Sequence, residues 1–412
     1  MGWKLMGELE IVSLHHIHKA LEELKPVIHR TPLDFSATFS KLTGYNVFLK
    51  AENLQKTGSF KIRGAYNKIQ MLSPEEKKKG VVAASAGNHA QGVAFAASRA
   101  GIPSTVVMPQ WAPLSKIMAT RDYGARVVLA GENYDEAYLE ARSIQDKTGA
   151  VFIHAFDDPA VIAGQGTVGL EIVEQLPDLD ALVVPVGGGG LIAGIATAVK
   201  SLRPEVEVFG VQAARVAPVF ARWKEGKFST EDTVGTIADG IAVKRPGEIT
   251  LPLIERLVDD IVAVEDEMIA QTILMLMERS KLIVEGAGAA ALAAMLAGKV
   301  RPKRKNVVVI ISGGNIDVNM VSKIIERGLV KTGRLAQLRT WLEDRPGALQ
   351  KLLSVVASTR ANVISVTHDR IKPAVPLTRA EVTLRLETKD TEHIAQIIKA
   401  LQEKGYKVKE LP

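Results

Sequence analysis

The chain contains no cysteine among its 412 residues. This absence excludes disulfide bonds, zinc sites built from thiolates and cysteine nucleophiles, and it leaves the redox compartment open. The 52 basic and 46 acidic residues are interspersed along the chain, and the one basic cluster, residues 301–305, directly precedes a predicted strand and is interpreted as a solvated loop. Although the formal net charge is +6, we therefore expect no nucleic-acid partner.

A membrane span and a secretory signal are not expected either. Residues 181–199 carry no charge and are long enough to cross a bilayer, but Pro185 and the glycines at 187–190 interrupt them. We predict a strand, a loop and a buried helix there. Residues 1–10 lack the apolar core of a signal peptide, so we expect a cytoplasmic protein without a membrane partner.

The length and composition indicate a globular chain with more than one domain. A chain of 412 residues is too long for one ordinary core. Hydrophobic residues make up 47% and charged residues 24%, which is typical of folded globular proteins.

Short apolar strands alternate with helical patterns over the first three quarters of the chain. This alternation predicts open, mostly parallel sheets with helices on both faces, an α/β architecture. The loops that follow parallel strands gather at one edge of the sheet, where ligands bind. The predicted strands are residues 46–50, 80–84, 104–108, 125–129, 152–154, 181–186, 206–211 and 307–311.

One lysine lies where a helix is predicted to begin, within residues 58–65. Ser59 is the predicted N-cap, and Lys61 follows in the first helical turn. The positive end of the helix dipole lowers the pKa of an amine, which makes Lys61 a candidate for carbonyl chemistry. A solvated lysine on an amphipathic helix is the alternative that these residues alone leave open.

Small and polar residues follow two other predicted strands. Residues 85–92 follow the strand at 80–84 and open an alanine-rich helix, an arrangement whose backbone amides suit a carboxylate. Ser312 follows the strand at 307–311, at the same sheet edge. An ordinary turn is the alternative at both places.

Four consecutive glycines follow the strand at 181–186. A tight turn needs one or two glycines, and each one carries an entropy cost, so a run of four favours a phosphate-binding loop at the head of a helix. The run is not a Walker motif, because no Gly-Lys-Ser/Thr follows it, and its spacing does not match the dinucleotide fingerprint.

Metal ligands are not found at a suitable spacing. His15, His16 and His18 fall on one predicted helix without carboxylates that face the same way. We therefore expect no metal site.

The pattern changes after residue 330. Alternating and helical spacings predict the order βαββαβ, one open sheet with two helices on one face, as in ferredoxin-like domains. The predicted strands are residues 335–343, 362–369, 380–387 and 406–410, and the helical spacings lie at 349–356 and 394–401.

Together the motifs between residues 31 and 319 resemble the fold-type II pyridoxal-phosphate enzymes, specifically the threonine dehydratase (threonine ammonia-lyase) branch. The resemblance implies that Lys61 forms the Schiff base with the cofactor, that Phe60 packs beside the cofactor ring and that Ser312 bonds the ring nitrogen. A serine partner does not hold that nitrogen protonated, so β-elimination is expected to compete well against transamination.

The same resemblance assigns two binding loops. One binds the substrate carboxylate, and its asparagine also reaches the ring hydroxyl; it comprises Ser85, Ala86, Gly87, Asn88 and His89. The other binds the phosphate; it comprises Gly187, Gly188, Gly189, Gly190 and Leu191.

The implied activity is the deamination of L-threonine to 2-oxobutanoate, and of L-serine more weakly to pyruvate. Lys61 is then both the anchor of the cofactor and the base that takes the α-proton. A serine racemase or a synthase of the same cofactor family, and a non-catalytic amino-acid sensor, are the alternatives.

The chain departs from the racemases at two positions. Residues 212–218, after the strand at 206–211, lack the acidic ligands that a divalent cation needs. Ala86 occupies the position of the racemase serine that works on the opposite face of the substrate. Both departures argue against racemisation as the main activity.

The C-terminal part is similar to an ACT domain. In that family the first strand-to-helix turn binds amino acids between two such domains, which implies a homo-oligomer, a dimer or a tetramer, and control by isoleucine or valine. A dimerisation module with an empty site is the alternative. The corresponding residues are Asp344, Arg345, Pro346, Gly347, Ala348 and Leu349.

We therefore expect a pyridoxal-phosphate-dependent catalytic domain over residues 1–330, with a small subdomain at roughly 50–155, followed by an ACT domain over 331–412.

Overall fold

The computed structural model describes residues 11–228, 235–371 and 375–411. The expectation about residues 1–10 lies outside them. The described chain forms two compact units, which divide between Asp317 and Val318.

The first unit contains a six-stranded sheet in the order β1-β2-β10-β7-β8-β9. β1 runs antiparallel to β2, and all other neighbours are parallel. Ile311 pairs with Ala51, so the chain leaves β2 and β10 at the same sheet edge. The strands are β1 Leu33–Phe35, β2 Asn46–Ala51, β7 Ala181–Pro185, β8 Glu207–Ala213, β9 Asp260–Val264 and β10 Asn306–Ile311.

A second sheet in this unit has four parallel strands in the order β5-β4-β3-β6. Two open, mostly parallel sheets were predicted, and this prediction is confirmed. β1 and β9 had no counterpart among the strands predicted for this part of the chain. The strands of the second sheet are β3 Val81–Ala84, β4 Ser104–Met108, β5 Arg126–Leu129 and β6 Val151–Phe152.

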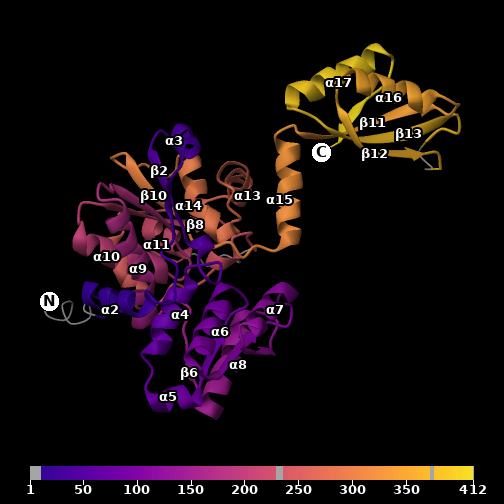
Figure 1. Cartoon of the computed structure of the whole chain (residues 1–412). Helices are drawn as coiled ribbons and strands as arrows, with labels where there is room; N and C mark the ends of the chain where they lie inside the picture. Colours follow the sequence, from indigo (N-terminus) through magenta and orange to yellow (C-terminus); the bar gives the residue numbers. More distant parts are fainter. Residues whose placement is uncertain (1–10, 229–234, 372–374, 412) are drawn as a thin grey trace. The chain divides into compact units, whose positions relative to one another are not determined.

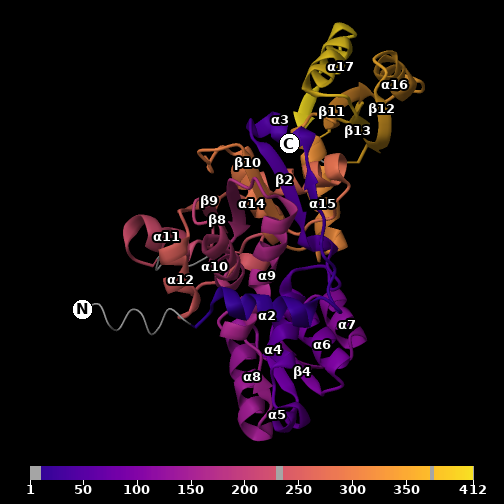
Figure 2. The ribbon, with the colours of Figure 1, turned by 60° about the vertical axis from the view of Figure 1, so that its left-hand side comes forward.

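Helices cover both sheets of the first unit (Figures 1 and 2). Around the second sheet lie α4 Lys61–Gln70, α5 Pro74–Lys79, α6 Asn88–Ala100, α7 Leu114–Asp122 and α8 Tyr134–Thr148. The other helices of the unit are α2 Leu14–Leu24, α3 Ala37–Thr43, α9 Pro159–Gln175, α10 Gly190–Leu202, α11 Pro218–Glu225, α12 Thr250–Leu257, α13 Asp266–Met275 and α14 Gly286–Leu296, with short turns η1 Glu52–Leu54, η2 Asp239–Ile241 and the π-helical η3 Leu276–Ser280.

Glycines let α4, α9 and α10 pack at short distances. A Cβ on Gly164 of α9 would lie 2.5 Å from the carbonyl oxygen of Arg63 in α4. A Cβ on Gly194 of α10 would lie 2.4 Å from the carbonyl oxygen of Ile162 in α9. No side chain fits at these two crossings, so α4, which begins with Lys61, packs closely on α9, and α9 packs closely on α10.

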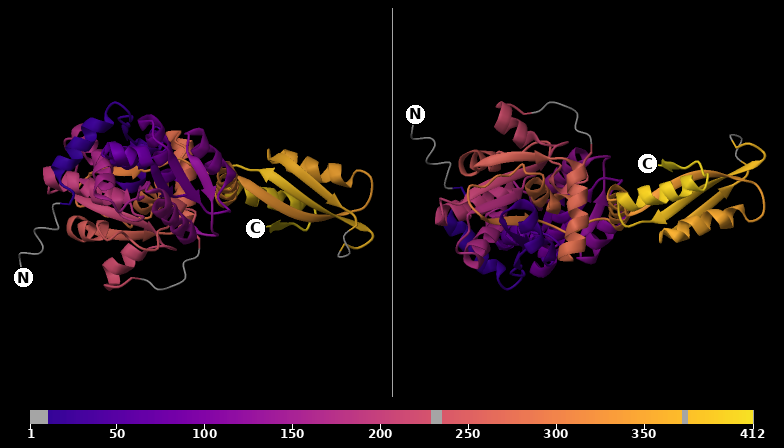
Figure 3. Two further views of the ribbon diagram at one scale, coloured as in Figure 1. Left: turned by 90° about the horizontal axis from the view of Figure 1, so that it is seen from below. Right: turned by 90° about the horizontal axis from the view of Figure 1, so that it is seen from above.

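The second unit begins with α15 Val318–Lys331 and continues in the predicted order βαββαβ. Its sheet has the order β12-β13-β11-β14, and Figure 3 shows the strands in orange and yellow. Leu352 and Val356 of one helix and Ile397 and Leu401 of the other pack into a single core. The elements are β11 Leu335–Glu343, α16 Ala348–Ser358, β12 Asn362–Asp369, β13 Arg379–Glu387, α17 Thr391–Glu403 and β14 Lys409–Leu411.

Among the described residues, no helix has the length and apolar character to cross a membrane. The histidine-rich helix α2 uses His16 for capping: the ring of His16 and the side chain of Ser13 form a capping box.

Candidate active site

The lysine motif and the Ser312 loop are joined through their backbones. Ser59 pairs with Gly313 in an isolated antiparallel bridge, and the Phe60 amide donates to the Ser312 carbonyl at 3.2 Å. The Gly314 amide donates to the Gly58 carbonyl at 2.8 Å. Two motifs separated by about 250 residues therefore form one surface at the edge of the larger sheet.

The predicted N-cap is wrong. Helix α4 begins at Lys61 with Phe60 at the N-cap position, and no side chain caps it. Ser59 is fully buried, and its hydroxyl has no hydrogen-bond partner in the described part of the chain. The bridge to Gly313 holds the backbone of Ser59 away from the capping position, which sequence alone does not reveal.

The Lys61 amine contacts the Ala155 carbonyl and lies near the Phe60 ring. Its Nζ donates to the Ala155 carbonyl at 2.8 Å and lies 5.3 Å from the centre of the Phe60 ring. Burial lowers the pKa of Lys61 to about 8, although the charge of Glu285 opposes part of this effect. Near neutral pH a useful fraction of the amine is therefore unprotonated and nucleophilic.

The loop at 85–89 joins β3 to α6, as predicted. The Ser85 hydroxyl accepts a hydrogen bond from the Gly87 amide at 3.1 Å, which shapes the turn before Asn88 begins the helix. Asn88 Nδ2 donates to Glu285 Oε1 at 2.6 Å, and Asn88 Oδ1 accepts from Asn315 Nδ2 at 2.7 Å. These bonds connect the loop to both the Ser312 loop and α14.

The His89 side chain is buried and makes a structural hydrogen bond to the backbone. Its ring is buried, and Nε2 lies 2.8 Å from the Ile153 carbonyl, which can only accept. Burial, with a contribution from Lys61, lowers the pKa of His89 to about 3. The imidazole is therefore neutral with its proton on Nε2.

The four glycines lie between β7 and α10, as predicted. The Gly188 carbonyl accepts from the Thr250 hydroxyl at 2.6 Å, and Gly189 has a left-handed φ of +95°, a conformation that glycine adopts at low cost. The amides of Gly187, Gly188 and Gly189 donate to no other described residue. Three free donors at the start of a helix fit a phosphate.

Phe156 connects this loop to the lysine. A Cβ on Gly188 would lie 2.4 Å from the Phe156 ring, so only glycine allows this contact. Phe156 directly follows Ala155, whose carbonyl accepts from Lys61. The site therefore combines an amine of lowered pKa and a set of free amides, which are the groups that a phosphorylated aldehyde needs.

Glu285 was not predicted as a site residue. It precedes α14, is buried, and its amide donates to the Gly313 carbonyl at 3.1 Å. Burial and the neighbouring Asp239 raise the pKa of Glu285 to about 7. The only sequence signal was a single acidic residue before a run of glycine and alanine.

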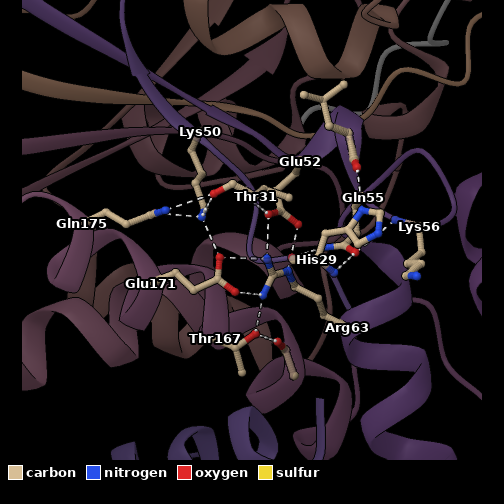
Figure 4. Close-up of polar contacts among 12 residues, drawn as sticks. His29, Thr31, Lys50, Glu52, Gln55, Lys56, Arg63, Thr167, Glu171 and Gln175 are labelled. Carbon is tan, nitrogen blue, oxygen red and sulfur yellow. Dashed lines mark hydrogen bonds and ion pairs between the residues drawn. The ribbon is translucent and has the colours of Figure 1, made fainter. Parts of the chain in front are cut away.

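A buried ion cluster lies on the opposite side of α4 from Lys61. Residues two apart on a helix point in nearly opposite directions, so Arg63 faces away from the lysine. Figure 4 shows its guanidinium between the carboxylates of Glu52 and Glu171. Lys50 also donates to Glu171, at 2.6 Å. The cluster joins β2, η1, α4 and α9.

The lowered pKa of Lys61 predicts its reactivity. In the cofactor-free protein, reductive methylation of Lys61 by formaldehyde and cyanoborohydride should rise with pH around a midpoint near 8. Replacing Glu285 with glutamine should lower this midpoint, because the carboxylate charge favours the ammonium form. Mass spectrometry of the Lys61 peptide measures both. A midpoint near the ordinary 10.5 in the folded protein would contradict the expected burial effect.

Comparison with known families identifies both units. Residues 24–313 match the family described as pyridoxal-phosphate dependent enzyme, and residues 336–403 match the ACT domain. Among curated proteins, the chain is 55% identical to an L-threonine ammonia-lyase of Thermotoga maritima, an alignment that covers 97% of this chain and 99% of that protein.

Solved structures agree on the fold of the first unit. Threonine deaminase isoform 2 of Solanum lycopersicum, in its processed form, is 40% identical with a TM-score of 0.72, over 76% of this chain and 87% of the other. Maize serine racemase is 36% identical with a TM-score of 0.73, over 78% of this chain and 98% of the other.

Proposed function

The chain belongs to the family of pyridoxal-phosphate dependent enzymes and carries an ACT domain, and from this premise we propose that it deaminates L-threonine to 2-oxobutanoate and ammonia. L-serine is the weaker substrate and gives pyruvate. The observation that carries the proposal is the convergence of Lys61, Asn88 and the glycine loop at one site, in a chain similar throughout to an L-threonine ammonia-lyase.

The described residues fit the cofactor. Lys61 anchors it through an amine whose pKa is lowered, and Phe60 lies beside that amine. The free amides of the glycine loop bind the phosphate, and α10, which begins at Gly190 and includes the buried Leu191, adds its helix N-terminus. Ser312, at the end of β10, bonds the ring nitrogen.

The protein positions the substrate and moves its protons. The loop of Ser85, Ala86, Gly87, Asn88 and His89 binds the substrate carboxylate through its amides and the start of α6. The Lys61 amine takes the α-proton, and the β-hydroxyl leaves as water after it is protonated. When bound, pyridoxal phosphate supplies the sink for the electron pair released at Cα. A water molecule then replaces the nitrogen at Cα, so that the loss of one water and the gain of another give 2-oxobutanoate and ammonia.

The racemase alternative has less support from these residues. Racemisation needs an acid on the face of Cα opposite the base, and Ala86 has no titratable group. Gln212, where the racemase metal site would begin, is buried and donates to the Val186 carbonyl while accepting from the Phe220 amide. Both ends of its side chain are occupied by structural contacts.

Assaying the products tests the proposal. Purified protein with pyridoxal phosphate should convert L-threonine to equal amounts of 2-oxobutanoate and ammonia, with kcat/KM for threonine about tenfold above that for serine, since one methyl group is worth about 1–3 kcal/mol in a pocket. Chiral analysis of the serine reaction is the control. Faster formation of D-serine than of pyruvate would favour the racemase, and no visible absorbance with added cofactor would favour a sensor.

The second unit is proposed to regulate the first. We propose that the catalytic domain nevertheless extends through most of α15, with the functional boundary between residues 330 and 331 rather than after Asp317, and with the small catalytic subdomain at roughly 50–155. Isoleucine or valine binds at the turn between β11 and α16, at an interface between paired ACT domains, so the protein is a dimer or a tetramer. We propose a role in isoleucine biosynthesis in the cytoplasm, because isoleucine is an end product of the pathway that consumes 2-oxobutanoate. The turn comprises Asp344, Arg345, Pro346, Gly347, Ala348 and Leu349.

If isoleucine binds at this turn, a substitution that strains the turn should weaken inhibition by isoleucine. Gly347 has φ +82°, so an alanine there strains the turn by about 1–2 kcal/mol. If this strain weakens effector binding by the same amount, the isoleucine concentration that gives half-maximal inhibition should rise about tenfold in Gly347→Ala. The control is Gly405→Ala, which imposes similar strain at φ +84° after α17. The same response in both variants and wild type would contradict an effector site at this turn.

A further inference from the structure

Two residues outside the predicted site hold Asn88 from both ends of its amide. Asn88 Nδ2 donates to Glu285 Oε1 at 2.6 Å, and Asn88 Oδ1 accepts from Asn315 Nδ2 at 2.7 Å. Asn315 Nδ2 also donates to the Thr57 carbonyl at 2.8 Å. Because that carbonyl can only accept, it identifies the nitrogen end of Asn315.

This arrangement permits one orientation of the Asn88 amide. Turning the amide over would set its NH2 group against the NH2 group of Asn315 and its oxygen against the carboxyl group of Glu285. The first contact is repulsive whatever the charge of Glu285, and the second is repulsive when Glu285 is ionised. The observed orientation uses one Nδ2 hydrogen for Glu285, and the other has no partner among the described residues.

Glu285 and Asn315 are themselves held in place. Asn315 packs against Gly58, where a Cβ would lie within 2.4 Å of its Oδ1. A Cβ on Gly313 would lie 2.3 Å from Glu285 Oε1. Both residues therefore lie close to the glycines where the lysine motif and the Ser312 loop meet.

We propose that Glu285 and Asn315 are positioning residues, which fix the Asn88 carboxamide so that its second Nδ2 hydrogen points to the cofactor's ring hydroxyl. The inference rests on the proposed function only in taking pyridoxal phosphate as the ligand of this site.

The charge around Glu285 is consistent with this role. The titratable groups that influence it are Asp239, Lys116 and Lys61, and Lys116 forms an ion pair with Asp239 at 2.7 Å. The Asn88 hydrogen bond lowers the pKa of Glu285, against the larger effect of burial. Donation from Asn88 thus favours the carboxylate, and the carboxylate in turn excludes the flipped amide.

A double-mutant cycle on cofactor affinity tests the proposal. Cofactor-free full-length variants are titrated with pyridoxal 5'-phosphate, and its visible absorbance gives the dissociation constant. Glu285→Ala and Asn315→Ala should each weaken cofactor binding about tenfold. Each substitution frees the Asn88 amide to turn, and a loss of its hydrogen bond to the charged cofactor has about this effect. In an Asn88→Ala background, neither substitution should weaken binding further.

Two further variants separate positioning from charge and from packing. Glu285→Gln keeps an acceptor for Asn88 and should remain within about threefold of wild type, since one uncharged hydrogen bond replaces a charged one. Asn67→Ala removes a buried amide of α4 that bonds to the Ala160 carbonyl, away from the site, and should leave affinity unchanged.

Several results would overturn the proposal. They are equal effects in the wild-type and Asn88→Ala backgrounds, unchanged affinity in both single alanine variants, or a Glu285→Gln protein as weak as Glu285→Ala. If Glu285→Ala does not fold, Asn315→Ala and Glu285→Gln carry the test. A wild-type protein that binds the cofactor but releases no ammonia from threonine would refute the proposed function, and the cycle would remain interpretable.

Discussion

Replacing Lys61 with alanine is expected to lower kcat for ammonia release from threonine by about 10⁴-fold or more, since one residue supplies both the covalent anchor and the base. Burial lowers the pKa of this lysine to about 8, so part of its amine is unprotonated near neutral pH and can act in both tasks. The protein should also lose covalent attachment of pyridoxal phosphate after borohydride reduction, which mass spectrometry detects.

Lys56 provides the matched control. It lies five residues earlier in the same segment, and its side chain is exposed. Lys56→Ala should keep the wild-type rate and the borohydride adduct at residue 61. Full ammonia release by the Lys61→Ala protein would refute the assignment of Lys61, whatever happens to cofactor binding.

Replacing Arg63 with methionine is expected to cost about 3–5 kcal/mol of folding stability, the range found when one partner of a buried ion pair is removed. All five N–H groups of its guanidinium find acceptors: Nε and Nη2 donate to Glu52, Nη1 and Nη2 to Glu171, and Nη1 also to Thr167. Removing them leaves two carboxylates inside the protein. Urea unfolding followed by circular dichroism measures the loss.

Two comparisons give this prediction its controls. Arg30→Met breaks the ion pair with Glu174 at 2.9 Å, in which both side chains are more than half exposed, and should cost about 0–1 kcal/mol. Adding Glu52→Gln to Arg63→Met should recover part of the lost stability, because Glu52 loses both of its guanidinium hydrogen bonds, whereas Glu171 keeps its ion pair with Lys50. An Arg63→Met protein with the wild-type free energy of unfolding would contradict the expected cost.

The cluster also predicts sensitivity to acid. Burial alone would raise the pKa of Glu52, but the charge and hydrogen bonds of Arg63, together with Lys50 and Thr31, outweigh it and lower that pKa from its ordinary 4.5. A carboxyl group whose pKa is lower in the folded state stabilises the protein above its ordinary pKa, and this stabilisation is lost as the pH falls. Wild-type stability should therefore decline below about pH 4.5.

Local patterns in the sequence were sufficient for the sheets and for the loops at their ends. Apolar strands such as Val81–Ala84 and Ala181–Pro185 are followed by glycine and polar residues, and both the strand and the loop after it are encoded within about ten residues. Two strands were not predicted: β1 Leu33–Phe35 has only three residues, and β9 Asp260–Val264 follows a helix without a clear turn signal. The roles of Lys61, Asn88, the glycine loop and Ser312 remain predictions of the sequence, and the structure brings these residues together.

Only the tertiary structure identified the residues that support the site. Glu285 lies almost 200 residues after Asn88, and Glu171 lies 108 residues after Arg63, so nothing in the local sequence pairs them. The wrong N-cap at Ser59 has the same origin, because a backbone bridge to Gly313 overrides a local capping preference. The sequence determined the elements and the reactive lysine, since periodicity and turn chemistry act over a few residues. Chain folding decided which buried charges and amides meet, because desolvation and hydrogen bonding depend on neighbours in space.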